Sequence, residues 1–342
     1  MSAMSTLERE IFGKTANGET VHRVRIAGGG LTAHVLSWGA VIQDLRLEGH
    51  DAPLTLGFDN FDDYLHHSSY FGATPGRCAN RIGGGRFTLD GKAYQLECNE
   101  KGVTHLHGGS DNIAKRIWQI VEHAADRVVL KIVDPDGRAG YPGNCTVQAT
   151  YRVHGGGELS VTYETVSDQP TLANVCQHAY FNLDGNATAL DHDLMLAADH
   201  YLPTDERQIP TGEVRPVDGT AFDFREMSPM KRFENGEQAL YDHNFCLSGA
   251  RTAKRSVALA RSRNSGVAME VRTTEPGVQF YAAFKLDVPV PGLGGRKYGP
   301  FAGFCLETQT WPDAINHEGF PNAVLRPGEV LRQETDYIFT RS

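Results

Sequence analysis

The sequence of 342 residues has no paired cysteine motif, no long apolar run and no cluster of basic residues. Its six cysteines are scattered without a Cys-x-x-Cys spacing, which indicates reduced packing residues rather than a disulfide framework or a zinc site. No stretch approaches the roughly 20 apolar residues of a membrane span, and the amino-terminal MSAMSTLEREIFGKT lacks the apolar core of a signal peptide. We therefore expect a cytoplasmic protein with no membrane partner.

The net charge is -9 at pH 7, and no run of Lys and Arg reverses it locally. Surfaces that bind nucleic acid are basic, so we expect no nucleic-acid partner, and acidic or phosphorylated substrates are slightly disfavoured. A hydrophobic content of 40% with 22% charged residues is typical of a soluble globular protein with a large core.

Helical periodicity is also scarce, because almost no segment keeps a 3.6-residue repeat over three turns. Only Phe61–Leu65 and Glu226–Arg232 indicate short helical turns. Three glycine-rich segments, at residues 28–30, 83–85 and 291–295, are not followed by Lys-Ser or Lys-Thr and do not lie between a strand and a helix. We interpret them as turns rather than phosphate-binding loops.

Period-2 alternation, by contrast, recurs along the whole chain and predicts an all-β protein. No linker or repeat divides it, so we expect one domain over residues 1–342. A single open sheet of this many antiparallel strands would curl or split, which predicts a large two-sheet sandwich. The predicted hairpins join residues 31–37 to 40–47, 86–89 to 92–96, 117–122 to 127–133, 145–153 to 158–166, and 256–261 to 267–272.

A single carboxylate, Glu307, stands in the apolar run Phe301–Trp311. Alternation along a strand places it on one face with Cys305 and Gln309, while Phe304, Leu306 and Thr308 face the other way. A charge is rarely buried without a partner or a task. Glu307 is therefore the first candidate for chemistry.

Two other strand-like segments offer polar side chains on one face. His178, Tyr180 and Asn182 alternate with apolar residues, which predicts a wet face carrying the imidazole. Gln279 and Tyr281 alternate in the same way. Taken alone, each of these residues is more often structural than functional.

Asn80, Arg81 and Asp242 are further polar candidates. Adjacent Asn80 and Arg81 could donate hydrogen bonds to a polyol, although a surface arginine is the simpler interpretation. Asp242 lies in Tyr241–Phe245, where three polar residues between aromatics form either a strand or a capped turn.

His105 and His107 flank Leu106, and an extended backbone would put both imidazoles on one face. Such a pair can bind zinc, but a third ligand at useful spacing is not apparent. We therefore expect no metal and favour a hydrogen-bonding or acid–base role for His107.

Together these segments resemble the aldose 1-epimerase (galactose mutarotase) family. The resemblance implies a galactose mutarotase-like β-supersandwich, an isomerase that interconverts the α and β anomers of free hexoses such as glucose and galactose, and no cofactor or metal. Its partner would be a monosaccharide, and the oligomeric state stays open. The matching segments, in the family's order, are GRCANRIGGGRFTLDGKAYQL, LHGG, QHAYFNLDG, YDHNF, TTEPGVQFY and CLETQTWPDAINHEGFPNAVLRPGE.

The resemblance also assigns roles to these residues. It implies that Glu307 is the catalytic base and His178 the catalytic acid, with His107 a second candidate for protonating the ring oxygen. Segments 99–104 and 283–289 differ from the usual galactose enzymes and are expected to form the rim of the cleft. The implied sugar-contacting residues are Asn80, Arg81, His107, Asp242 and Gln279.

The proposed chemistry suits these residue types. Opening a pyranose ring removes a proton from the anomeric hydroxyl and gives one to the ring oxygen, which requires an ionised base and a protonated acid. We expect Glu307 to be ionised at neutral pH, and His178 to stay partly protonated beside carboxylates such as Asp242.

Other functions stay open at this point. A glycoside hydrolase would use Asp242 and Glu307 as paired carboxylates. In a non-catalytic carbohydrate-binding domain, stacking aromatics such as Trp311 or Tyr180 would carry the affinity. An epimerase acting on a phosphorylated sugar, or another proton-transfer enzyme, is a further alternative.

Overall fold

The computed structural model describes residue 7 and residues 9–341. The sequence predicts no signal peptide at the amino terminus, and part of that segment lies outside the described residues. Strands dominate, and every ladder between them is antiparallel, which confirms the all-β prediction. In the described part of the chain, no helix is long and apolar enough to cross a membrane.

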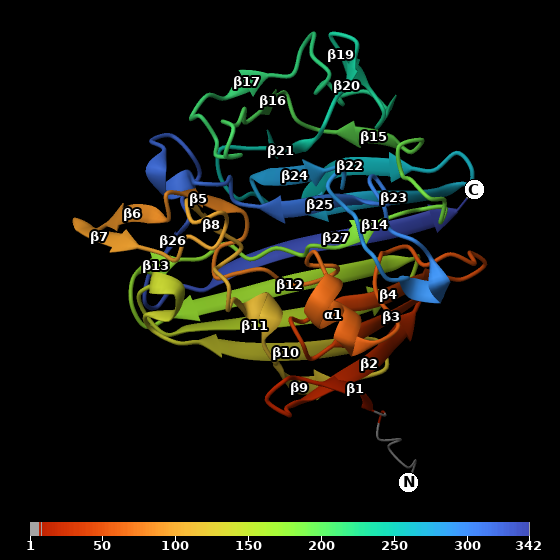
Figure 1. The fold of residues 1–342 in the computed structure, drawn as a ribbon, viewed down its shortest axis with the longest axis horizontal. Helices are drawn as coiled ribbons and strands as arrows, with labels where there is room; N and C mark the ends of the chain where they lie inside the picture. The colour runs from red at the N-terminus through yellow and green to blue at the C-terminus, as the bar shows by residue number, and fades with distance from the viewer. Residues whose placement is uncertain (1–6, 8, 342) are drawn as a thin grey trace.

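A nine-stranded sheet forms the centre of the molecule, with the carboxy-terminal strand β27 in its middle (Figure 1). Its long strands alternate buried and solvent-facing residues, as a sheet with one covered face requires. The order across the sheet is β18 (Ser228–Pro229), β15 (Asp193–Leu196), β22 (Arg255–Arg261), β23 (Val267–Thr273), β27 (Leu331–Arg341), β12 (Glu158–Ser167), β11 (Cys145–His154), β10 (Arg127–Asp134) and β9 (Gln119–His123).

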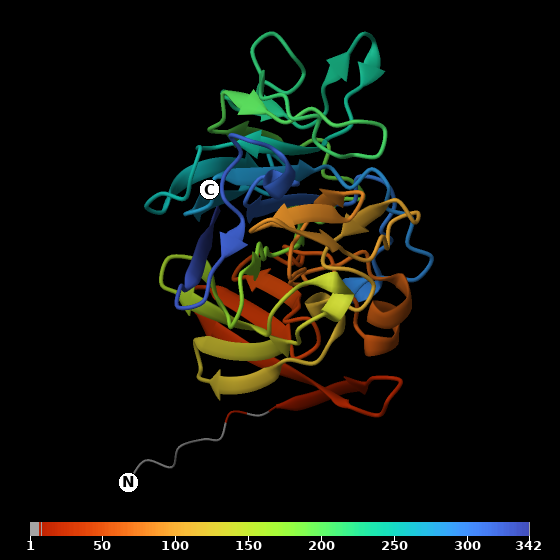
Figure 2. The same cartoon turned by 90° about the vertical axis from the view of Figure 1, so that its left-hand side faces the viewer.

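Two smaller sheets share the core of this sheet. Figure 2 shows the amino-terminal sheet, in red, at the opposite end of the molecule from the hairpin of β19 (Phe233–Glu234) and β20 (Glu237–Gln238). The four-stranded sheet contains β1 (Glu10–Lys14), β2 (Thr20–Gly28), β3 (Leu31–Leu36) and β4 (Ile42–Leu47). The six-stranded sheet has the order β14 (Tyr180–Phe181), β25 (Phe304–Gln309), β24 (Gly277–Tyr281), β21 (Asp242–Cys246), β16 (His200–Tyr201) and β17 (Arg215–Pro216).

Short strand pairs and one α-helix complete the fold. The pairs are β5 (Arg81–Gly83) with β8 (Thr104–Leu106), β6 (Arg86–Leu89) with β7 (Lys92–Gln95), β13 (Thr171–Leu172) with β26 (Val324–Leu325), and β19 (Phe233–Glu234) with β20 (Glu237–Gln238). The 3-10 turns are η1 (Ile113–Lys115), η2 (Arg138–Gly140), η3 (Leu293–Gly295) and η4 (Ala314–Asn316).

One of the two predicted helical turns is confirmed and the other is wrong. Helix α1 (Phe61–His67) begins after Asn60, whose side chain accepts a hydrogen bond from the Asp63 N–H. Residues 226–232 are not helical and contain the edge strand β18. Pro229 explains the difference, because it cannot donate a helical hydrogen bond and disfavours helical backbone at Ser228.

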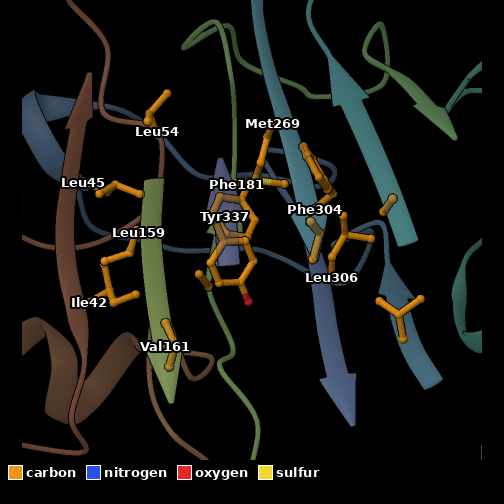
Figure 3. Close-up of a cluster of buried hydrophobic side chains, with 14 of the residues drawn as sticks. Ile42, Leu45, Leu54, Leu159, Val161, Phe181, Met269, Phe304, Leu306 and Tyr337 are labelled. Atoms are coloured by element: carbon orange, nitrogen blue, oxygen red, sulfur yellow. The ribbon is translucent and has the colours of Figure 1, made fainter. Parts of the chain in front are cut away.

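The main core lies between the nine-stranded sheet and the two smaller sheets (Figure 3). Leu159 and Val161 of β12 and Phe304 and Leu306 of β25 are buried in it, together with Tyr337 of β27. Full burial of one such side chain contributes about 1.5–3 kcal/mol, so this layer holds the strands of the six-stranded sheet in fixed positions. All five predicted hairpins are present in the structure.

Candidate active site

Adjacent strands of the six-stranded sheet bring three of the candidate residues together. Gln279 of β24 pairs directly with Glu307 of β25, and β21 carries Asp242 on the other side of β24. As alternation predicts, Phe304 and Leu306 enter the core (Figure 3). Glu307 faces the other side, where it contacts Cys176 and His178. Asp242 lies in a strand, not in a capped turn.

His178 reaches the same place because its backbone pairs with Ala73 just before β14 joins β25. Its Nε2 lies 3.6 Å from Oε2 of Glu307. Both side chains are buried, so the predicted wet face around His178 is wrong. Each member of the pair also contacts a thiol. Cys176 donates to Oε2 of Glu307 at 3.6 Å, and Sγ of Cys305 lies 3.7 Å from Nδ1 of His178.

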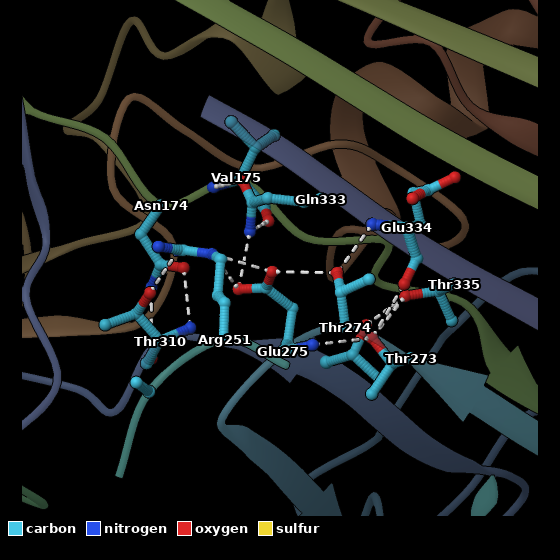
Figure 4. Close-up of polar contacts among 12 residues, drawn as sticks. Asn174, Val175, Arg251, Thr273, Thr274, Glu275, Thr310, Gln333, Glu334 and Thr335 are labelled. Atoms are coloured by element: carbon cyan, nitrogen blue, oxygen red, sulfur yellow. Dashed lines mark hydrogen bonds and ion pairs between the residues drawn. The ribbon is translucent and has the colours of Figure 1, made fainter. Parts of the chain in front are cut away.

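A buried polar network fixes the segment before His178 against the end of β25 (Figure 4). Asn174 accepts a hydrogen bond from the Thr310 N–H at 2.9 Å and donates one to the Thr310 carbonyl at 3.2 Å. Arg251 donates to Thr310 at 2.6 Å and forms an ion pair with the buried Glu275. The network therefore joins the segment that leads to His178 to the end of the strand that carries Glu307.

His107 also lies beside His178, but His105 does not. The backbone of His107 is left-handed, with φ of 53°, which breaks the alternation that we expected. His105 turns away to Tyr141, whose hydroxyl lies 2.7 Å from its Nε2, so the prediction of two imidazoles on one face is wrong. The ring of His107 lies 5.2 Å from that of His178 and 4.6 Å from that of Tyr70.

Arg81, Asp242 and their ion-pair partners Glu100 and Lys285 form the more exposed edge of the site, which we call the rim. Oδ1 of Asp242 accepts a hydrogen bond from Gln279 at 2.9 Å, and Oε1 of Gln279 is buried without a partner among the described residues. Arg81 donates to both carboxylate oxygens of Glu100, at 2.8 and 2.9 Å. Asn80 accepts a hydrogen bond from the Arg81 N–H at 2.9 Å. All seven predicted site residues therefore gather in one region.

Burial changes the protonation of the central pair. It raises the pKa of Glu307 to about 8, helped by the charge of Asp242, and it lowers the pKa of His178 to about 4. The expectations that Glu307 is ionised and that His178 is partly protonated are therefore wrong for the sugar-free site at neutral pH. The pair holds a single proton there, on the carboxyl group.

Burial and neighbouring charges also set the pKa values of His107 and Asp242. Burial lowers the pKa of His107 well below its usual value, helped by His178 and Arg81. For Asp242, burial acts to raise the pKa, but Arg81, Lys285 and the hydrogen bond from Gln279 outweigh it and keep the pKa low. Asp242 is therefore the ionised carboxylate of the site.

Three side chains could hold a metal ion, since ligand atoms of His107, His178 and Glu307 lie within 4.8 Å of one another. No third ligand is apparent from the sequence, because the three residues are far apart along the chain. Nδ1 of His107 accepts the Asn80 N–H at 3.1 Å, which leaves the ring proton on Nε2, the nitrogen otherwise free for a metal. The trio therefore fits hydroxyl groups better than a cation.

Sequence reasoning missed four residues of the site: Tyr70, Glu100, Gln208 and Lys285. Glu100 and Lys285 belong to the segments that depart from the family pattern, which was the available signal. Gln208 and Tyr70 have left-handed backbones, and no sequence motif predicts this conformation at either position.

The aromatics proposed for a carbohydrate-binding domain are not available for stacking. Trp311 is 7% exposed and donates its Nε1–H to the Pro276 carbonyl. Tyr180 is 2% exposed and donates its hydroxyl to the Ser69 carbonyl. Neither ring is open to a sugar.

Comparison with known proteins agrees with this geometry. The family model described as aldose 1-epimerase matches residues 22–337. Galactose mutarotase of Rattus norvegicus is 41% identical over 98% of this chain and 99% of its own, and aldose 1-epimerase of Escherichia coli K12 is 34% identical over 91% and 92%. The crystal structure of an aldose epimerase homologue from C. elegans superposes with a TM-score of 0.88 at 31% identity, covering 94% of this chain and 99% of that one. The chain belongs to the aldose 1-epimerase family.

Proposed function

We propose that this chain, acting as one domain, is an aldose 1-epimerase that interconverts the α and β anomers of free hexoses such as glucose and galactose. The observation that carries the proposal is the buried pair of Glu307 and His178, whose facing atoms are 3.6 Å apart. The unpaired Oε1 of Gln279 supports it, because a buried acceptor without a partner fits a sugar hydroxyl. The names of two relatives, galactose mutarotase and aldose 1-epimerase, agree with this activity.

In the proposed mechanism Glu307 takes the proton of the anomeric hydroxyl while His178 gives one to the ring oxygen. The bond from C1 to the ring oxygen breaks, the open-chain aldehyde rotates about C1–C2, and the 5-hydroxyl attacks the other face of the aldehyde. The free pair already holds the one proton that this step needs, but on the carboxyl group. This proton must pass to His178, and the charge of Asp242 helps the pair to keep it, because that charge raises the pKa of both groups.

The charges at the rim favour neutral sugars. Arg81 is paired with Glu100, and Lys285 is paired with Asp242. A phosphorylated sugar would bring negative charge to a cleft whose cations are already neutralised, and that costs desolvation without a free partner. A glycosidase using Asp242 and Glu307 would leave His178 without a role.

Polarimetry tests the proposal. Freshly dissolved α-D-glucose and α-D-galactose should relax faster with the protein than in buffer alone, and Glu307→Gln should remove the acceleration while sparing sugar binding. Relaxation no faster than the blank for either sugar, or for arabinose and xylose, would refute the function. Release of sugar from aryl glycosides would instead support the glycosidase.

A further inference from the structure

Two loop residues, Gln208 and Lys285, connect Asp242 and Arg81, which are expected to bind the sugar. Gln208 lies in the turn between β16 and β17, and Lys285 follows β24. Nε2 of Gln208 donates to Oδ2 of Asp242 at 2.6 Å, and Nζ of Lys285 lies 3.2 Å from the same oxygen. Oε1 of Gln208 accepts from Nη2 of Arg81 at 3.0 Å and from Nζ of Lys285 at 2.7 Å.

These contacts allow only one orientation of the Gln208 amide. Its carbonyl oxygen has two lone pairs, and two cationic donors occupy them. A flipped amide would place its NH₂ group against Arg81 and Lys285 and its oxygen against Asp242. Gln208 is therefore a fixed link between the arginine and the carboxylate.

The same contacts determine what is left for a ligand. An ionised carboxylate has about four acceptor positions, and Asp242 uses three of them for Gln279, Gln208 and Lys285. Arg81 uses Nε and Nη2 for Glu100 and Gln208, and no described group accepts from its Nη1. One acceptor on Asp242 and one NH₂ group on Arg81 stay open, which fits the hydroxyl groups of one neutral sugar.

The backbone conformation of Gln208 indicates that the turn does not need a glutamine, so the contribution of this residue comes from its side chain. Its φ is 61°, a region that glycine adopts without strain and other residues rarely do. The turn is held by main-chain hydrogen bonds from Gln208 to Asp205 and from Asp205 to Ile209, which glycine would keep. A purely structural turn would therefore tolerate glycine at this position.

We propose that Gln208 and Lys285 are positioning residues that hold Asp242 and Arg81 in their sugar-binding orientation before the sugar arrives. This inference rests on the proposed function. None of the described contacts of Gln208 or Lys285 reaches Glu307 or His178. Their contribution is to the affinity for the sugar rather than to proton transfer, because fixed partners lose less entropy on binding.

The test compares Gln208→Gly and Lys285→Met with wild type in polarimetric assays of α-D-galactose and α-D-glucose. Each variant should raise KM about tenfold and change kcat by less than about twofold, since uniform binding is what is lost. Lys285→Arg should restore most of the affinity. Gln208→Gly should not lower Tm. Arg207→Ala is the matched control, because Arg207 is exposed and its side chain binds only Asp205 among the described residues.

A KM within about twofold of wild type in both variants would overturn the inference, as would a fall in kcat at unchanged KM, which indicates only a damaged fold. If wild type shows no turnover above the blank, the proposed function fails instead. Calorimetric titration with D-galactose then tests the positioning role separately from the activity. The dissociation constant should rise about tenfold in both variants, and constants equal to that of wild type would refute the positioning role.

Discussion

The buried carboxyl of Glu307 should make the fold less stable as the pH rises, and Glu307→Gln should remove that loss. The pKa of Glu307 is raised from 4.5 to about 8 in the folded protein. A group with a raised folded pKa contributes stability that is fully present below its unfolded pKa and is lost as the pH rises through the folded pKa. The loss therefore falls between about pH 4.5 and pH 8.

The size of the effect follows from the same two values. At about 1.4 kcal/mol per pH unit, this carboxyl makes wild type about 4 kcal/mol less stable at pH 8.5 than at pH 5. The amide introduced by Glu307→Gln does not ionise, and all other titrating groups are common to both proteins. Allowing for relaxation around the charge, the free energy of unfolding of Glu307→Gln should gain about 2–4 kcal/mol on that of wild type over this range.

Urea unfolding at pH 5 and pH 8.5 measures this difference, and polarimetry on the same samples measures activity. We expect Glu307→Gln to lose at least about 100-fold in rate while becoming relatively more stable at high pH. Glu318→Gln makes the same substitution at an exposed position, and its stability should follow wild type at both pH values. A gap between Glu307→Gln and wild type that does not change with pH would refute the reasoning.

Three further outcomes are expected. The rate constant kcat/KM, corrected for the blank, should fall below about pH 4, where His178 gains a proton, and above about pH 8, where Glu307 loses one; a flat profile from pH 5 to pH 9 would contradict this. Glu275→Ala should lower the free energy of unfolding by about 3 kcal/mol in urea titrations, because it removes the buried partner of Arg251 and Gln333; a loss no greater than that of an exposed glutamate would contradict it. Dialysis against EDTA should leave the mutarotation rate unchanged, since His107 keeps its proton on Nε2; activity lost to EDTA and restored by Zn²⁺ would show that the trio binds metal.

Alternation along the strands made the central residues predictable. The side chain of Glu307 and the core packing of Phe304 and Leu306 follow from a period of two, and so does the placement of Gln279 beside them. The hairpins were equally clear, because each combines alternation with a turn of glycine, asparagine or aspartate.

Features that depend on distant contacts could not be predicted in this way. The pKa values of Glu307 and His178 reflect burial, which exists only after the sheets pack. The left-handed backbone of His107 breaks the alternation that had paired it with His105. Gln208 meets Arg81 and Asp242 only because a turn far along the chain lies over both.

The arrangement of Asn174 and Thr310 has a consequence for how such an enzyme can change. Their hydrogen bonds join the segment before His178 to the end of β25, which carries Glu307, whereas Gln208 and Lys285 belong to loops. The proposed proton-transfer pair and the two proposed positioning residues therefore belong to different parts of the chain. Exchanging the two loops is expected to change the affinity for the sugar while the distance between Glu307 and His178 stays the same.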